Sequence, residues 1–181
     1  FSTIIRLMHS SQKVVGIFDS WVGGFSVMNS IRGLLPAQPL YYIADQAHVP
    51  YGLRSMEQIR NFTRGITRYL LDEGAGLIVV ACNTASAAAL KSLRQEFPEI
   101  PFVGMEPAVK PASQKTLSGV VGVLATPATF QGELFASLVE RFGKDVKILR
   151  STCPGLVNEI EAGRLTGKKT RHILEEAIRP M

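Results

Sequence analysis

The chain has 181 residues, of which 46% are hydrophobic, and its 20 Lys and Arg against 15 Asp and Glu give a net charge of +5. This composition indicates a folded globular protein and excludes a disordered one. The basic residues are spread along predicted helices, which favours solvated helix faces over a nucleic-acid surface. No apolar run reaches the roughly 18–20 residues that a membrane span needs.

The first twelve residues are expected to form a frayed leader. The apolar run from Ile4 to Met8 is too short for the hydrophobic region of a signal peptide, and no small-residue cleavage site follows it. The chain has only two cysteines, so we expect reduced thiols and a cytoplasmic protein rather than a secreted disulfide scaffold. The first residue is Phe rather than Met, which fits a fragment or a processed product.

Residues 13–106 are predicted to form a first α/β domain. Ser55 is the expected N-cap of its second helix, and Gly74 is the expected C-terminal stop of that helix. Apolar runs and helical spacing predict strands at 13–18, 40–44, 77–81 and 102–105, and helices at 25–35, 56–73 and 85–97.

Residues 107–181 are predicted to form a second, smaller α/β domain, with the boundary at Glu106-Pro107. The alternation of strands and helices predicts mostly parallel sheets in both domains. The expected strands are 119–124 and 146–149, and the expected helices are 108–116, 126–142, 153–161 and 170–178.

Polar and thiol side chains follow most of the predicted strands. In such folds, ligands bind at the carboxyl ends of strands. The three histidines are scattered without ligand spacing, and the paired glycines match no phosphate-binding motif, so we expect no metal and no nucleotide. The strand ends are Asp19-Ser20, Asp45, Cys82-Asn83-Thr84, Glu106, Thr126 and Cys153.

Cys82 ends an apolar strand and precedes an alanine-rich helix. A thiol there lies near the positive end of the helix dipole, which favours the thiolate. A buried cysteine that only packs is the commoner case, but Asn83, Thr84 and Ser86 surround this one with hydrogen-bonding groups. For Cys82 we therefore favour the chemical interpretation. Asp19 either forms a simple turn at the entry to its helix, which is the usual case, or holds an ammonium group or orients the thiol.

Five motifs follow one another between about residues 14 and 163. They are Gly16-Ile17-Phe18-Asp19-Ser20-x-Val22-Gly23-Gly24, Ala44-Asp45-x-Ala47-x-Val49-Pro50-Tyr51-Gly52, Ala81-Cys82-Asn83-Thr84-Ala85-Ser86, Val121-Gly122-Val123-Leu124-Ala125-Thr126-x-Ala128-Thr129 and Cys153-Pro154-x-x-Val157-x-x-x-Glu161-x-Gly163. Each motif alone is a weak signal, whereas five in this order and spacing are specific. Together they resemble the signatures of bacterial glutamate racemases.

The resemblance implies two pseudosymmetric parallel-sheet α/β domains of the Asp/Glu racemase type, with a site between them. It implies interconversion of L- and D-glutamate without a cofactor, by a two-base (Cys/Cys) proton transfer at Cα that supplies D-glutamate for peptidoglycan. Glutamate is then the expected small-molecule ligand. No nucleic-acid or membrane partner is expected, and a homodimer is left open.

By this resemblance, Cys82 is one of the two acid/base thiols, and Asp19 lies beside it, where it contacts the substrate ammonium and tunes the cysteine. Glu161 is implied to support the histidine beside the second cysteine. The implied substrate-binding positions are Ser20, Pro50, Tyr51, Gly52, Asn83 and Thr84, together with the hydroxyls of Thr126 and Thr129 from the second domain.

Two features depart from the family pattern. Trp21 stands where the family has glycine, so it strains the loop, plugs the site or points outward. The family's second catalytic cysteine lies in a Gly-Cys-Thr-His-Tyr-Pro motif that does not occur in these 181 residues, and Cys153 is not expected to replace it. We therefore expect a C-terminally truncated racemase, with an incomplete second domain and closing segment, whose activity alone is open.

Two other functions stay open. The chain is either a racemase of another small acid, such as aspartate or a hydantoin, or a catalytically inactive ligand-binding or regulatory protein. The Asp-Ser-x-Val-Gly-Gly and Val-Pro-Tyr-Gly stretches favour glutamate, whereas Trp21 and the absent thiol motif favour the inactive protein.

Overall fold

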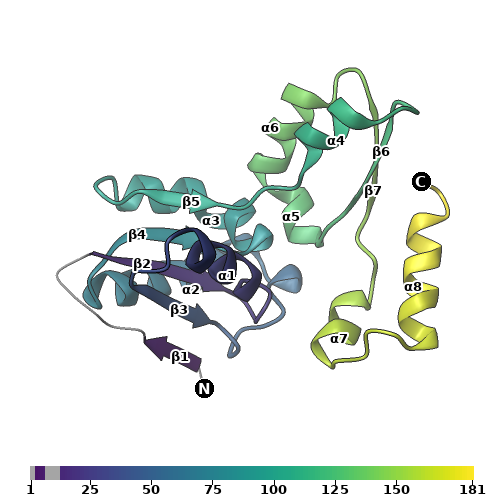
Figure 1. The fold of residues 1–181 in the computed structure, drawn as a ribbon. Helices are drawn as coiled ribbons and strands as arrows, with labels where there is room; N and C mark the ends of the chain where they lie inside the picture. Colours follow the sequence, from purple (N-terminus) through teal and green to yellow (C-terminus); the bar gives the residue numbers. More distant parts are fainter. Residues whose placement is uncertain (1–2, 7–12) are drawn as a thin grey trace. The chain divides into compact units, whose positions relative to one another are not determined.

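The computed structural model describes residues 3–6 and 13–181, which are arranged as two compact units (Figure 1). The first unit is Phe1–Glu106 and the second is Pro107–Met181. Each unit has its own sheet and its own core. The two units are described separately below.

The first unit is a five-stranded sheet in the order β1-β3-β2-β4-β5. Four strands are parallel, and β1 (Thr3–Arg6) runs antiparallel along the edge of β3. Parallel strands covered on both faces are typically continuous apolar runs, which is how these segments read in the sequence. The parallel strands are β2 (Val14–Asp19), β3 (Leu40–Ala44), β4 (Ala75–Val80) and β5 (Phe102–Gly104).

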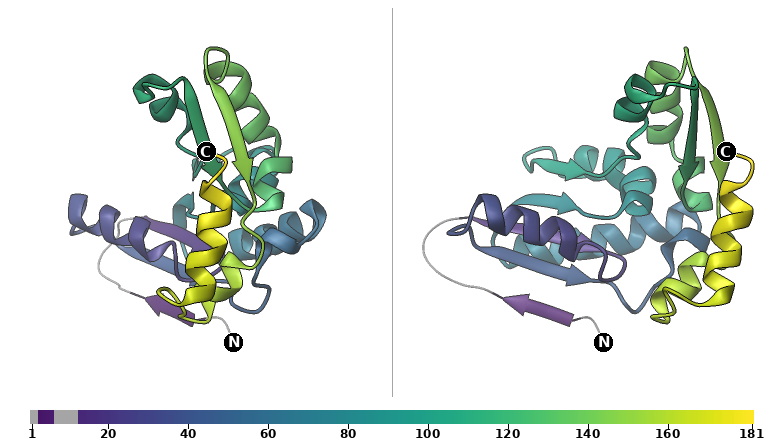
Figure 2. Two further views of the ribbon diagram at one scale, coloured as in Figure 1. Left: turned by 90° about the vertical axis from the view of Figure 1, so that its right-hand side faces the viewer. Right: turned by 45° about the vertical axis from the view of Figure 1, so that its right-hand side comes forward.

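Helices cover both faces of this sheet (Figure 2). One face, which includes Ile17, Tyr42 and Val79, packs against α1 (Phe25–Leu34). Side chains alternate along a strand, so the neighbouring residues face the other layer, formed by α2 (Met56–Asp72) and α3 (Asn83–Glu96). A short 3-10 helix, η1 (Tyr51–Leu53), precedes α2.

The expectation of a frayed leader is wrong for Thr3–Arg6. These residues pair with Tyr41–Ala44 of β3, from Thr3 opposite Ala44 to Arg6 opposite Tyr41. Without β1, one edge of β3 would leave its main-chain donors and acceptors unpaired. The rest of the predicted leader lies outside the described residues.

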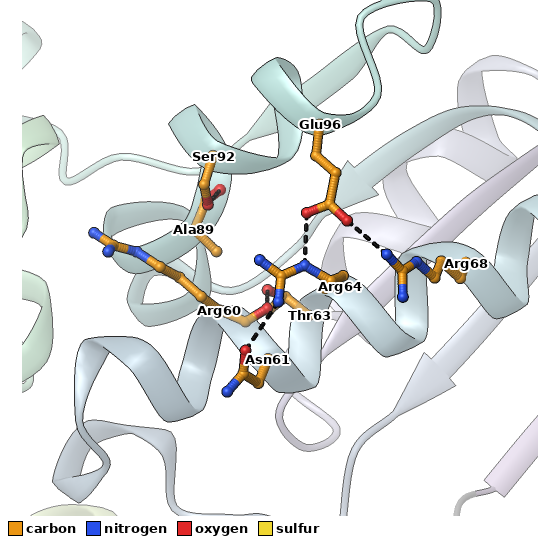
Figure 3. Close-up of polar contacts among 8 residues, drawn as sticks. All are labelled: Arg60, Asn61, Thr63, Arg64, Arg68, Ala89, Ser92 and Glu96. Atoms are coloured by element: carbon orange, nitrogen blue, oxygen red, sulfur yellow. Dashed lines mark hydrogen bonds and ion pairs between the residues drawn. The ribbon is translucent and has the colours of Figure 1, made fainter.

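Charged contacts join α3 to α2 on the surface of the unit (Figure 3). Glu96 near the end of α3 accepts hydrogen bonds from Arg64 Nε at 2.6 Å and Arg68 Nη2 at 2.8 Å. Arg64 also donates to Asn61 Oδ1 at 2.9 Å, and Arg60 Nε donates to a carbonyl of α3 at 2.8 Å. Because α3 begins next to Cys82, these contacts hold the helix that carries the candidate thiol.

The second unit has a two-stranded parallel sheet of β6 (Val120–Leu124) and β7 (Lys147–Ser151). Its buried core gathers Val109, Val121, Val123, Phe135 and Leu138. The helices are α4 (Val109–Lys115), α5 (Pro127–Gln131), α6 (Glu133–Phe142), α7 (Leu156–Glu161) and α8 (Lys168–Ile178).

The single helix predicted over 126–142 is wrong, because Gly132 divides it. Gly132 has extended backbone angles (φ −70°, ψ 142°), so it ends α5 and acts as the N-cap of α6. Apart from proline, glycine is the least favourable residue in a helix interior, since it loses the most backbone freedom there. Within the described residues, no helix combines the length and the apolar character needed to cross a membrane.

The N-cap of α2 offers a test of local stability. Ser55 accepts the N–H of Gln58, and the Gln58 side chain accepts the N–H of Ser55, which is a capping box. Replacing Ser55 with Ala is expected to lower the free energy of unfolding by about 1 kcal/mol. Urea unfolding followed by far-UV circular dichroism measures the change.

The matched control is Ser30→Ala. Ser30 lies inside α1, and its hydroxyl donates to the carbonyl of Ser26 one turn earlier, at an exposed position. Substitutions at exposed positions without a special role stay within about 0.5 kcal/mol. Equal losses in the two variants would contradict the capping role.

Candidate active site

The carboxyl ends of β2, β3 and β4 meet at one edge of the first sheet. Asp19 is the last residue of β2, Asp45 follows β3, and Cys82 lies two residues beyond β4. Asp19 pairs in register with Ala44, and the N–H of Asp45 donates to the carbonyl of Asp19 at 2.9 Å. The sheet therefore brings three predicted strand-end side chains to a single edge.

The buried carboxylate of Asp19 organises the loop after β2. Its Oδ1 accepts the N–H of Ser20, and its Oδ2 accepts the N–H of Gly24, both at 2.7 Å. The Ser20 hydroxyl also donates to Oδ1 at 3.4 Å. Hydrogen bonds to an ionised acceptor are the strong ones, so the loop main chain both stabilises this buried charge and is held by it.

Cys82 is buried as the N-cap residue of α3. Its Sγ accepts the N–H of Ala85 at 3.4 Å and lies 3.7 Å from Ser20 Oγ. The sulfur thus contacts a donor of its own helix and a hydroxyl of the loop after β2. The predicted residues Asp19, Ser20 and Cys82 are brought into one chain of contacts.

The helix terminus favours the Cys82 thiolate as predicted, through the N–H of Ala85, but it does not decide the protonation state of the thiol. Burial, followed by the negative charge of Asp19, raises the pKa of the Cys82 thiol from 9.0 to about 11. Hydrogen bonds from Ala85 and Ser20 lower that pKa, but removal of the sulfur from water outweighs them. Cys82 is therefore a protonated thiol at neutral pH.

The turn at residues 49–52 is fixed by Asp45. Tyr51 is buried, and its hydroxyl donates to Asp45 Oδ2 at 2.6 Å. His48 Nδ1 lies 2.9 Å from each oxygen of the same carboxylate, and the His48 ring stacks on Phe62 of α2 at 3.8 Å. Burial, followed by the hydrogen bond to Asp45, raises the pKa of Tyr51. Because the phenol proton is used in the hydrogen bond to Asp45, the groups that this turn can offer a ligand are those of its main chain.

The other predicted binding positions of the first domain flank these residues in the chain. Pro50, which follows a cis peptide bond, and Gly52 are partly buried on either side of Tyr51. Asn83 and Thr84 are the first two residues of α3, the former exposed and the latter buried. Ser86 serves the fold, because it donates to the main chain of β4 at 3.1 Å and accepts the N–H after β5 at 2.9 Å.

Trp21 does not strain its loop. Among the described residues, Cys153 is the one non-glycine residue with positive φ, so Trp21 has a backbone conformation open to any residue. Trp21 as a residue is half-buried, and its carbonyl accepts the hydroxyl of Tyr42 at 2.9 Å. Gly24 is crowded, since a methyl group there would lie 2.8 Å from Tyr42 Oη and 2.9 Å from Asp19 Cβ. In the sequence, Tyr42 belongs to none of the motifs and is simply one residue of an apolar strand.

In the second unit, predicted residues follow both strands. After β6, Thr126 is the N-cap of α5; its hydroxyl accepts the N–H of Thr129 at 3.3 Å, and the two hydroxyl oxygens are 2.9 Å apart. After β7, Cys153 is buried with φ 44°, and its Sγ lies 3.7 Å from Ser151 Oγ.

The buried carboxylate of α7 is that of Glu159 rather than Glu161. Glu159 is 2% exposed, and it accepts hydrogen bonds from Arg164 Nε at 2.7 Å and Lys169 Nζ at 2.8 Å. These bonds lower the pKa of Glu159 to about 2. Glu161 ends α7 and is partly buried, and its implied role beside a histidine stays a prediction.

The donor set at the edge of the first sheet suits a small charged organic ligand. In the part of the chain that the structure describes, no three His, Cys, Asp or Glu side chains form a group able to hold a metal ion. The edge offers two buried carboxylates, which suit an ammonium group. It also offers a thiol, hydroxyls and main-chain N–H groups, which suit carboxylates and proton transfer.

Residues 22–181 match the model of the Asp/Glu/Hydantoin racemase family. The chain belongs to this family. The glutamate racemase of Ectopseudomonas mendocina is 53% identical over 174 residues, which are 96% of this chain and 66% of that protein. The chain thus spans about two thirds of the length of this curated racemase.

Two solved racemase structures share the fold. Glutamate racemase isoform RacE1 of Bacillus anthracis superposes with a TM-score of 0.82 at 31% identity, over 94% of this chain and 64% of that one. Escherichia coli glutamate racemase, in complex with L-glutamate and the activator UDP-MurNAc-ala, superposes with a TM-score of 0.81 at 36% identity. The superposition covers 93% of this chain and 64% of that one. The predicted α/β fold with parallel sheets and the predicted family are confirmed.

The charge of Asp19 can be tested through the Cys82 thiol. Asp19→Asn removes the negative charge beside the sulfur, so the pKa of Cys82 is expected to fall below about 11. It should stay above 9.0, because burial is the larger cause of the increase. The measurement is the pH dependence of iodoacetamide alkylation at Cys82, followed by peptide mass mapping. Asp72→Asn, at the end of α2, is the matched control, and an unshifted Asp19→Asn profile would refute the electrostatic link.

The Glu159 ion pairs predict an acid-dependent stability of the second unit. The pKa of Glu159 is lowered from 4.5 to about 2, so its contribution is complete above pH 4.5 and is lost as the pH falls towards 2. Glu159→Gln is expected to lower the melting temperature at pH 7 and to flatten its dependence on pH between 4.5 and 2. Thermal melts across that range measure both effects.

Glu161→Gln is the control for this variant, because Glu161 lies in the same helix and is less buried. Its melting temperature should change less than that of Glu159→Gln at pH 7. A larger change in melting temperature for Glu161→Gln would show that Glu161, and not Glu159, is the stabilising carboxylate.

Proposed function

We propose that this chain carries one of the two acid/base thiols of a glutamate racemase, and that the whole protein interconverts L- and D-glutamate without a cofactor. The observation that carries the proposal is the contact of Cys82 Sγ with Ser20 Oγ beside Asp19, at the carboxyl ends of parallel strands. The identity of 53% to a glutamate racemase supports the substrate. The structure of the E. coli relative in complex with L-glutamate supports it further.

The chemistry asked of the site is removal of a weakly acidic Cα proton. A base must be close to that proton, and the developing negative charge must meet donors already in place. Cys82 is rigidly held by a strand end and a helix start, which suits a group that must face a Cα atom. Its raised pKa means that it first acts as a proton donor, or must be activated before it acts as a base.

Substrate binding supplies that activation in the proposed mechanism. The carboxylate of Asp19 has one main-chain donor on each oxygen, and it retains further acceptor capacity for an ammonium group. A substrate ammonium beside Asp19 would offset the negative charge that raises the pKa of Cys82. Bound substrate would therefore lower the pKa of Cys82, and a larger fraction of thiolate would form than in the empty site, with the thiol proton passing to solvent.

The remaining predicted residues bind the two carboxylates of glutamate in this proposal. In the first unit, these are the main chain at Pro50, Tyr51 and Gly52, the start of α3 at Asn83 and Thr84, and the hydroxyl of Ser20. Thr126 and Thr129 would contribute hydroxyls from the second unit, and Glu161 would support a histidine beside the second thiol.

The opposite face of Cα needs a second acid/base group. The Gly-Cys-Thr-His-Tyr-Pro motif that would carry it does not occur in these 181 residues. We assign the second proton transfer to that thiol in the whole protein rather than to Cys153, which follows β7 in a motif of its own. We further propose that the product serves peptidoglycan synthesis in the cytoplasm. Whether the protein forms a homodimer stays a prediction.

Deuterium exchange tests the role of Cys82. The chain is incubated with D- or L-glutamate in deuterated buffer, and deuterium at Cα is measured by mass spectrometry while the enantiomers are separated by chiral chromatography. We expect exchange into one enantiomer by this chain and no inversion without a second thiol. Cys82→Ser should lower the exchange rate by at least about 100-fold, the usual contribution of general acid–base catalysis.

Cys153→Ser is the matched control and should exchange at the unaltered rate. Exchange that survives Cys82→Ser would remove Cys82 from the mechanism. Faster exchange with aspartate or a hydantoin would overturn the choice of glutamate. No exchange together with no glutamate-induced thermal shift would support a catalytically inactive protein instead.

A further inference from the structure

We propose that Tyr42 is a positioning residue, whose hydroxyl holds the loop after Asp19 so that Ser20 stays against the sulfur of Cys82. The role rests on the proposed function, because it concerns the same thiol. Tyr42 does not contact the sulfur in this proposal. It acts through the main chain of the loop.

Tyr42 is packed into the core and supports the loop from the sheet. It lies on β3 with 1% of its surface exposed, and its ring stacks on Phe25 of α1 at 4.5 Å. Its hydroxyl donates to the carbonyl of Trp21 at 2.9 Å. The ring is thus fixed by packing, and the one hydroxyl proton is used on the loop.

The loop between β2 and α1 has two anchors of opposite polarity. The carboxylate of Asp19 accepts the N–H groups of Ser20 and Gly24, whereas Tyr42 donates to the carbonyl of Trp21. Ser20 is therefore fixed on both sides, by Asp19 at its own N–H and by Tyr42 at the next residue. Ser20 is also the loop residue that touches the sulfur.

The environment of Tyr42 keeps its hydroxyl protonated. Burial, followed by the negative charge of Asp19, raises the pKa of the phenol. Tyr42 Oη also lies close to Gly24, where a methyl group would come within 2.8 Å of it. The hydroxyl therefore fills the space between the loop and the sheet as a permanent donor.

Tyr41 provides a matched control on the same strand. It is also buried, and its hydroxyl lies 3.3 Å from the hydroxyl of Tyr69 on α2. Because neighbouring residues of a strand face opposite sides, Tyr41 faces α2 while Tyr42 faces α1. Tyr41→Phe removes the hydroxyl of a buried tyrosine in the same unit and leaves the hydrogen bonds of the loop in place.

The test compares Tyr42→Phe with Tyr41→Phe in the whole chain. Trp21 is the only tryptophan of the sequence, so its emission and its quenching by acrylamide report the loop directly. Tyr42→Phe should shift the emission to longer wavelength and increase quenching. Water that reaches the sulfur weakens the largest cause of its raised pKa, so alkylation of Cys82 at pH 8 should rise by about tenfold if that pKa falls by about one unit.

Cys153 of the same protein is an internal reference, since it belongs to the second unit and its alkylation should not change. Tyr41→Phe should leave both Trp21 and Cys82 as they are. Equal effects of the two variants would overturn the proposal. Failure of Tyr42→Phe to fold, seen by circular dichroism, would also overturn it, because the hydroxyl would then serve overall stability.

These readouts need no glutamate, which separates the two proposals. A shift of Trp21 and Cys82 in a chain that shows no deuterium exchange would overturn the proposed function and leave the positioning role standing. Normal exchange with unchanged Trp21 and Cys82 in Tyr42→Phe would overturn the positioning role alone.

Discussion

The first unit depends on how it accommodates the buried charge of Asp19. A carboxylate removed from water is costly unless donors replace the solvent, and here the donors are N–H groups of the loop that the same residue begins. Satisfying the charge therefore orders the loop and brings Ser20 to the sulfur. The same charge disfavours the thiolate. A cation that binds beside Asp19 would lower the pKa of the Cys82 thiol, while the loop would stay ordered by its hydrogen bonds to the carboxylate.

Around this charge, rigid elements hold the thiol from several sides. The start of α3 is tied to β4 and β5 through Ser86, and the end of the same helix is tied to α2 through Glu96. The turn at 49–52 is held by the hydrogen bond from the Tyr51 hydroxyl to Asp45. A site built on strands and helices in this way keeps its geometry better than one built on loops alone.

The order and type of most elements follow from apolar patterning, because buried parallel strands are unbroken apolar runs between amphipathic helices. What the sequence could not supply depends on contacts between distant residues. The pairing of Thr3–Arg6 needs the open edge of β3. The pKa of Cys82 needs its burial and the nearby Asp19, whereas only the helix terminus is visible in the sequence. In α7, two glutamates stand two positions apart, and only the fold shows that Glu159 is the one that meets Arg164 and Lys169.

The crowding around Gly24 has a consequence for how this loop can vary among related proteins. Gly24 has φ −63°, a conformation that any residue adopts, so glycine is required there for space and not for backbone freedom. Three side chains enclose the position, those of Asp19, Tyr42 and Ala81. Trp21 stands in the same loop with an ordinary negative φ. Substitution in this loop is therefore tolerated at Trp21, next to Ser20, and excluded at Gly24, which borders the sheet.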